Sequence, residues 1–128
     1  MSRPDDTRTE LLYEGEWLRL VRRGKWEACE RTHSAEGLAV IVIAVTPADE
    51  VLFVEQYRMA LGAPTIEMPA GLVGDDDAGD TLEAAATREL VEETGWEPGR
   101  VEILLTGPTS SGMSNERIAF ARARDLRR

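Results

Sequence analysis

The stretch "DTLEAAATRELVEETGW", residues 80–96, decides how this sequence folds. Asp80 suits a helix N-cap, and Glu83 three residues later suits a capping box. A helix is therefore predicted from Thr81 to Thr94, ended by Gly95 in the position after its last turn. The apolar residues that form one stripe at helical spacing are Leu82, Ala86, Leu90 and Val91.

Three carboxylates crowd the last turns of this helix. Glu89 and Glu93 lie about 40° apart around the axis, and Glu92 lies about 60° to the other side of Glu89. Like charges at this spacing repel, and the helix dipole disfavours anions at this end. A cation would offset both effects, and oxygen ligands favour Mg²⁺ or Mn²⁺. Taken alone, the three residues fit a solvated acidic face better than a metal site.

The rest of the chain is mostly strands. The almost wholly apolar stretch "GLAVIVIAV" (37–45) predicts a central strand that is buried on both faces. The other predicted strands are Leu11–Val21 and Trp26–Thr32 around a bend at Gly24, a returning strand at 51–58, Thr65–Met68, 101–107 and 117–123. Residues 71–80 read as a loop. Together these elements predict an α+β domain with a mixed sheet.

Composition limits the functional classes. The chain has 128 residues, which fits one domain, and a net charge of −9, which argues against duplex nucleic acid as a partner. Residues 1–10 are polar and do not resemble a signal peptide, and the longest apolar run, 38–45, is too short to span a bilayer. A single cysteine, Cys29, excludes an intrachain disulfide and favours the cytoplasm. The single histidine, His33, lies in a polar turn and is interpreted as solvated.

The residues around the helix resemble the Nudix box. The matching positions are Gly71, Asp80, Arg88, Glu89, Leu90, Glu92, Glu93, Gly95 and Trp96. The pattern departs from the usual form in two places: eight residues rather than five follow Gly71, and the next acidic position is Asp80 rather than Glu. The resemblance implies the Nudix fold, a mixed sheet in an α/β/α sandwich, and hydrolysis of a nucleoside diphosphate linked to another group.

The same resemblance implies roles for the box residues. It makes Glu89 and Glu93 metal ligands, and Glu92 either a ligand or the base. The backbone carbonyl of Ala70 matches a further ligand. Arg88 would orient the carboxylates through a charged hydrogen bond. The implied cofactor is Mg²⁺, with Mn²⁺ as the alternative.

Two further stretches, "VEQYR" (54–58) and "EMPAGLV" (67–73), resemble the ADP-ribose pyrophosphatase branch. In that branch the N-terminal sheet exchanges between subunits, and aromatic side chains from both partners sandwich the adenine. The residues that match substrate-binding positions are Trp17, Trp26, Arg31, Arg58 and Glu116. Considered without the motif, Arg58 could equally be an exposed arginine at a strand end, the tryptophans could be core residues, and Glu116 could cap a strand.

The resemblance covers nearly all of residues 11–126. It predicts a single Nudix domain over 1–128, with a flexible tail at 1–9, a dimerisation hairpin at 10–34 and a Nudix core at 35–128. Relatives usually continue through a mobile loop with a further Glu and a second helix over the other sheet face. A fragment, a deleted tail and a short natural form all stay open. We therefore expect either a tighter dimer or an incomplete sequence, because one apolar sheet face would otherwise be exposed to solvent.

The predicted function is Mg²⁺-dependent hydrolysis of ADP-ribose, or of a related ADP-sugar, to AMP and ribose 5-phosphate by a cytoplasmic homodimer. The nucleotide sugar is the expected partner, without nucleic acid or membrane. Two alternatives stay open. One is a diphosphatase for another nucleotide sugar such as GDP-mannose, and the other is a non-catalytic module that binds a nucleotide.

Overall fold

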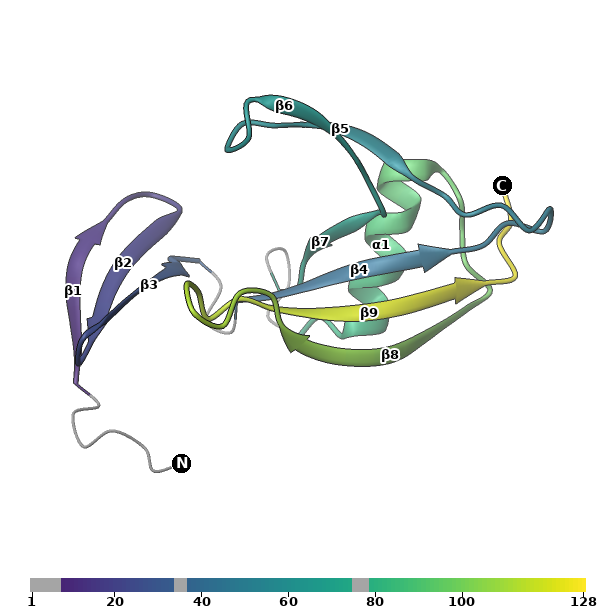
Figure 1. The fold of residues 1–128 in the computed structure, drawn as a ribbon. Helices are drawn as coiled ribbons and strands as arrows, with labels where there is room; N and C mark the ends of the chain where they lie inside the picture. The colour runs from purple at the N-terminus through teal and green to yellow at the C-terminus, as the bar shows by residue number, and fades with distance from the viewer. Residues whose placement is uncertain (1–7, 34–36, 75–78) are drawn as a thin grey trace.

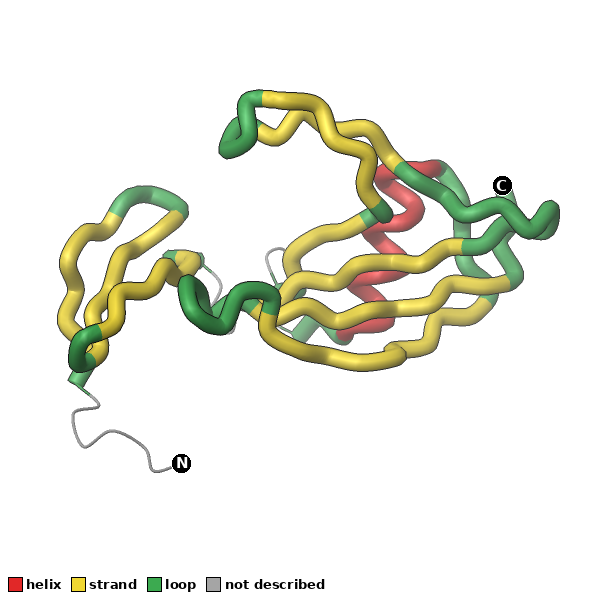
Figure 2. The backbone as a smooth tube through the Cα atoms, viewed as in Figure 1, coloured by secondary structure: helices red, strands yellow, loops and turns green. Residues whose placement is uncertain are grey.

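A computed structural model describes residues 8–33, 37–74 and 79–128. Residues 1–7 of the predicted tail and 75–78 of the predicted loop lie outside the described residues. Figures 1 and 2 show a central sheet backed by a helix, with a small sheet beside it and a hairpin arching above it. None of the helices described is long and apolar enough to cross a membrane.

The central sheet has four strands: β4 (Leu38–Ala44), β7 (Ala70–Leu72), β8 (Arg100–Pro108) and β9 (Arg117–Arg124). Their order is β7-β4-β9-β8. β4 runs parallel to β9 and antiparallel to β7, while β8 and β9 are antiparallel. The sheet is therefore mixed and the apolar strand β4 is interior, which confirms both predictions.

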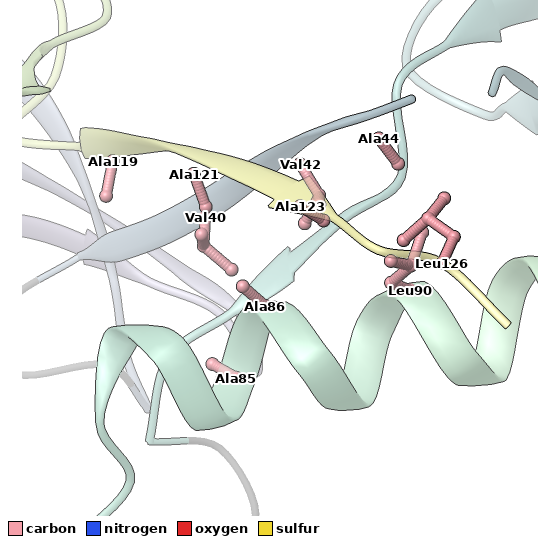
Figure 3. Packing of buried hydrophobic residues seen from close by; sticks show 10 residues of the cluster. All are labelled: Val40, Val42, Ala44, Ala85, Ala86, Leu90, Ala119, Ala121, Ala123 and Leu126. Carbon is pink, nitrogen blue, oxygen red and sulfur yellow. The ribbon is translucent and has the colours of Figure 1, made fainter. Parts of the chain in front are cut away.

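The helix α1 (Leu82–Thr94) packs on one face of this sheet. Figure 3 shows the core between them, which consists of Val40, Val42, Ala44, Ala85, Ala86, Leu90, Ala119, Ala121, Ala123 and Leu126. Six alanines among these ten residues let the helix approach the sheet closely. The opposite face carries Ile41, Ile43 and Phe120, which are only half-buried. The expectation that β4 is buried on both faces is thus wrong for the described residues, because their single helix covers one face.

The start of α1 differs from the prediction by one residue. Thr81 is the N-cap, with extended backbone (φ −84°, ψ 159°) and a hydroxyl that accepts from Ala84 N at 3.1 Å. Asp80 does not cap the helix, because its carboxylate is drawn into an ion pair with Arg88 at 2.5 Å. The predicted end is confirmed: Gly95 adopts the left-handed conformation (φ 73°), which suits a residue without a side chain.

The N-terminal sheet has three strands instead of the predicted two: β1 (Thr9–Glu14), β2 (Leu18–Arg23) and β3 (Trp26–Arg31). The chain turns at Gly15, whose N–H donates to the carbonyl of Leu18 at 2.8 Å, and this turn splits the predicted strand Leu11–Val21 in two. The sheet joins the rest of the fold where Cys29 N donates to the Met113 carbonyl at 2.8 Å.

The returning strand is shorter than predicted and lies outside the central sheet. It forms β5 (Val54–Arg58), which pairs with β6 (Ala63–Glu67) in a separate two-stranded sheet. β4 offers it no free edge, since β7 lies on one side and β9 on the other. The segment still contacts the end of β4, where Leu52 N donates to the Ala44 carbonyl at 3.0 Å and Val51 forms a bridge with Val45. The segment therefore leaves the central sheet and forms the arching hairpin of Figure 1.

Candidate active site

The site is built on the face of α1 that does not pack into the core. Ala86 and Leu90 are buried against the sheet, which leaves the acidic side chains of the last turns beside β7 and the hairpin. Glu89 and Glu93 are partly buried, whereas Glu92 is exposed. The helical spacing therefore brings two of the three carboxylates against other elements and leaves the third in solvent.

Glu89 lies directly against the backbone of β7 at Gly71. A Cβ atom on Gly71 would sit 1.9 Å from the Glu89 Cδ and 2.0 Å from its Oε1. Only glycine leaves room for this carboxylate, which explains why a glycine at this position belongs with the acidic helix. The close approach holds the carboxylate in a narrow space between helix and strand.

Glu93 is held by donors from two elements. Its Oε1 accepts a hydrogen bond from Gln56 Nε2 of β5 at 2.7 Å, and its Oε2 accepts one from the backbone N–H of Ala70 at 3.1 Å. Ala70, whose carbonyl was predicted as a metal ligand, is therefore next to a predicted ligand side chain. Gln56 was not singled out from the sequence. It could have been found, because the two-residue period of a strand places it on the same face as Arg58.

Arg88 links the loop before the helix to this site. Its Nη1 pairs with Asp80 at 2.5 Å, and its Nη2 donates to the Leu72 carbonyl at 3.3 Å and lies 3.5 Å from Glu89 Oε1. The guanidinium thus bridges the start of α1, β7 and the Glu89 carboxylate. Asp80, the unusual residue at its motif position, acts as the partner of Arg88.

The electrostatics of Glu89 bear on metal binding. Burial raises the pKa of Glu89; the Arg88 charge opposes this, and the charges of Glu92 and Glu93 raise the pKa further. Within the described part of the chain, no three acidic, histidine or cysteine side chains already converge as a metal site. The donor set nevertheless fits a hard divalent cation, because it consists of mutually repelling carboxylate oxygens beside a backbone that only glycine allows.

Arg58 lies on the face of the hairpin that carries Gln56. It makes a two-pronged ion pair with Glu67, with Nε–Oε1 at 2.9 Å and Nη2–Oε2 at 2.5 Å. Hydrogen bonds from Arg58 and Thr65 lower the pKa of Glu67 to about 2, and the Glu67 carboxylate raises the pKa of Arg58. The predicted phosphate-binding arginine is thus already oriented by a carboxylate that the sequence did not single out.

Arg31 and Glu116 pair with each other. Arg31 Nη2 lies 2.8 Å from Glu116 Oε2, and Arg31 Nε donates to the same oxygen at 2.9 Å. The pair ties β3 to the segment just before β9, two parts of the chain that are 85 residues apart. In this chain the two predicted substrate residues therefore lie together at the junction of the N-terminal sheet and the core.

Trp17 and Trp26 lie at opposite ends of the β2–β3 pair. Trp17 precedes β2 and stacks edge-on with His33 at 5.5 Å, whereas Trp26 opens β3 opposite Arg23 and lines a cavity of about 480 Å³. Along the strands, the positions of Trp17 and Trp26 are six residue steps apart, which corresponds to about 20 Å. Both indoles are exposed, Trp17 by 66% and Trp26 by 73%. One chain therefore cannot place both rings on one adenine.

Comparison with known proteins supports this reading of the helix and its neighbours. The family model described as "NUDIX domain" matches residues 35–123. A "Methanol dehydrogenase activator" from Bacillus methanolicus is 33% identical over 123 residues, covering 93% of this chain and 65% of its own length. An "ADP-sugar pyrophosphatase" from Mus musculus is 36% identical over 124 residues, covering 85% of this chain and 56% of its own length.

Among solved structures, one titled "Crystal structure of ADP compounds hydrolase" superposes with a TM-score of 0.81 at 16% identity. The match covers 99% of this chain and 70% of that one, and at this identity it establishes the fold alone. The family model covers more than half of the 128 residues, including the helix and both of its partner elements. The chain therefore belongs to the NUDIX domain family.

Proposed function

We propose that this protein hydrolyses the diphosphate bond of ADP-ribose, or of a related ADP-sugar, to give AMP and, from ADP-ribose, ribose 5-phosphate. The observation that carries the proposal is the pair of carboxylates at the end of α1, with Glu89 against Gly71 and Glu93 held by Gln56 and Ala70. The names of the mouse relative and of the solved structure support the substrate class. The chain spans about half to two thirds of the relatives compared, so the activity of the whole protein is part of the proposal.

Glu89, Glu93 and the Ala70 carbonyl would hold a divalent cation, Mg²⁺ or Mn²⁺, with Glu92 either a further ligand or the base. Such an ion neutralises phosphate charge and lowers the pKa of water. Arg88 keeps Glu89 oriented between helix and strand. Glu92 is exposed and so can accept the proton of the attacking water, whose oxygen bonds to phosphorus as the diphosphate P–O bond breaks.

Arg58 is the proposed phosphate-binding residue. A guanidinium carries five N–H donors, and Glu67 takes only those on Nε and Nη2. Among the residues that the structure describes, the hydrogen bonds of Arg58 use Nε and Nη2, which leaves Nη1 for a phosphate oxygen, while the ion pair fixes the plane of the guanidinium. Glu67 would therefore reduce the conformational entropy that Arg58 loses when substrate binds.

We also propose that the active unit is a cytoplasmic homodimer of single-domain chains, with residues 10–34 exchanged between subunits. The separation of Trp17 and Trp26 supports this, since one adenine can contact both only if they come from different chains. Exposed apolar side chains on the N-terminal sheet and the hairpin support it as well: Leu11, Tyr13, Leu18, Tyr57, Met59, Leu61 and Ile66. Arg31 and Glu116 would then border the nucleotide at the junction.

Incubation with ADP-ribose and Mg²⁺, followed by chromatography, tests the activity. AMP is expected as a product, and turnover of GDP-mannose is expected to be poor because the tryptophan pair is proposed to select adenine. Failure to cleave any nucleoside diphosphate sugar would overturn the proposal, and tight binding without cleavage would identify a nucleotide-binding module instead.

Mixing two variants tests the shared site. Trp17→Ala and Trp26→Ala homodimers should each bind ADP-ribose weakly. Refolding the two together should restore wild-type affinity at one site of each mixed dimer, because that site combines the remaining Trp17 of one subunit with the remaining Trp26 of the other. No recovery, with dimers present by light scattering, would contradict the exchange.

A further inference from the structure

The Glu93 carboxylate is fixed by one donor on each oxygen. Gln56 Nε2 donates to Oε1 at 2.7 Å and Ala70 N donates to Oε2 at 3.1 Å. A carboxylate that accepts on both oxygens can neither rotate freely nor tilt toward its neighbours. The direction of its remaining lone pairs is thereby set by the protein.

The two donors have different origins. The N–H of Ala70 is placed by the backbone register of β7 on β4, where Ala70 faces Ile41. Gln56 belongs to the separate β5–β6 sheet and reaches Glu93 across 37 residues of sequence. A side-chain change can therefore remove the Gln56 donor while the backbone donor stays in place.

Local charge makes such donors necessary. Glu93 lies one helical turn from Glu89, and like charges four residues apart on a helix repel each other. The C-terminal end of a helix presents carbonyl groups, which cannot donate to it. A neutral amide compensates for the repulsion without adding a cation that would compete with a bound metal.

Gln56 is itself well anchored. Its backbone carbonyl accepts from Thr65 Oγ1 at 3.1 Å, and Thr65 faces it across the hairpin. The same hydroxyl lies 2.5 Å from Glu67 Oε1, and Glu67 holds Arg58. The hairpin thus carries a continuous set of contacts from the proposed phosphate-binding residue to the proposed metal ligand. The side-chain amide must turn its NH₂ group toward Glu93, since an ionised carboxylate only accepts.

From these contacts we propose that Gln56 is a positioning residue for Glu93. The hairpin holds Gln56 in place, and the Gln56 amide orients the Glu93 carboxylate for metal binding. The proposal rests on the proposed function in one respect, the assignment of Glu93 as a metal ligand. The position lies outside the acidic helix and its glycine, so it adds a residue from a third element to the machinery.

Mn²⁺ binding without substrate, measured by electron paramagnetic resonance, tests this role separately from hydrolysis. Gln56→Leu, which keeps approximate size but removes the donor, should weaken Mn²⁺ binding by about 10–100-fold. Gln56→Glu keeps the shape and replaces the donor by a like charge, so it should weaken binding at least as much. The matched control is Glu55→Gln, since Glu55 is the preceding residue on the exposed face of β5, and it should bind Mn²⁺ like the wild type.

A double-mutant cycle distinguishes positioning from general disturbance of the hairpin. In a Glu93→Gln background, Gln56→Leu should cause little further loss of Mn²⁺ affinity, because the carboxylate it orients is already gone. Wild-type Mn²⁺ affinity in folded Gln56→Leu and Gln56→Glu, or an equal loss in the Glu93→Gln background, would overturn the proposal. So would a wild-type protein that binds no Mn²⁺. Wild-type protein that binds Mn²⁺ but cleaves no nucleotide sugar would overturn the proposed function, and the cycle would still decide the role of Gln56.

Discussion

Replacing Gly71 with alanine should displace Glu89 while leaving the fold intact. The new Cβ would lie 1.9 Å from Glu89 Cδ, whereas ordinary van der Waals contact begins at 3.4 Å. The carboxylate must therefore retreat by at least 3.4 − 1.9 = 1.5 Å. It is the far end of a flexible side chain and is 16% exposed, so it can swing toward solvent instead of forcing β7 and α1 apart.

The expected effects on stability and activity are therefore very different. Gly71 is not among the glycines with positive φ, so alanine fits its backbone without strain. Loss of unfolded-state entropy stabilises such a substitution by about 0.4–1 kcal/mol, which offsets the cost of moving Glu89. The free energy of unfolding should change by less than about 1 kcal/mol. Activity should fall at least about 100-fold, since a misplacement of about 1 Å in a catalytic site has that effect.

Urea unfolding, Mn²⁺ binding and AMP formation from ADP-ribose measure the three quantities. Gly107→Ala is the matched control, because Gly107 lies in a strand, lacks positive φ and would place its Cβ in open space. In a Glu89→Ala background Gly71→Ala should add no further loss. Wild-type Mn²⁺ affinity and activity in Gly71→Ala would refute the reasoning, as would the same loss in Gly107→Ala.

Three further outcomes are expected. Glu93→Gln should reduce AMP formation by more than about 100-fold with an unchanged unfolding midpoint, since it removes a ligand charge; a twofold change would mean that the acidic face is only solvated. Trp26→Ala should raise the KM for ADP-ribose and leave kcat nearly unchanged, because it removes base stacking worth about 1–3 kcal/mol. An unaltered KM would exclude stacking on this indole. Burial raises the pKa of Glu30, but hydrogen bonds from Arg23 and Arg19 outweigh it and hold the pKa below 4.5. Glu30→Gln should therefore lower the free energy of unfolding by about 1–3 kcal/mol at pH 7. The difference in the free energy of unfolding between wild type and Glu30→Gln should have its full size above pH 4.5. It should shrink as the pH falls through the lower pKa that Glu30 has in the folded protein. Denaturant midpoints from pH 7 to pH 3 check this, and a difference that does not change with pH would contradict it.

The parts of the fold predicted correctly depend on spacing within one element. Helical periodicity placed Leu90 toward the core and Glu89 and Glu93 on another face, because 3.6 residues per turn fix those directions without any partner. The wholly apolar composition of β4 likewise predicted an interior strand without knowledge of any partner element. Gly95 ended the helix because its left-handed conformation is a local backbone property.

The errors arose where two elements compete for one partner. Asp80 suits a cap by sequence, yet the guanidinium of Arg88, eight residues along the chain, pairs with it and Thr81 is the N-cap. The segment 51–58 is predicted as one strand, yet only Val54–Arg58 forms a strand and it pairs with β6, because β7 and β9 occupy both edges of β4. Neither outcome follows from the local sequence pattern alone. Each depends on which of the competing contacts has the lower free energy.

The sequence by itself predicted one acidic helix preceded by a glycine-containing loop, since residue type and spacing are enough to crowd carboxylates on a helix face; Gly71 and Leu72, predicted in that loop, instead belong to β7. Tertiary structure alone decided which residues from distant parts of the chain lie together. It brought Gln56 to Glu93 across 37 residues, paired Arg31 with Glu116 across 85, and set Trp17 and Trp26 at opposite ends of one strand pair. The physical reason is that contacts between elements depend on free sheet edges and on charge partners, and neither is encoded in the periodicity of a single segment.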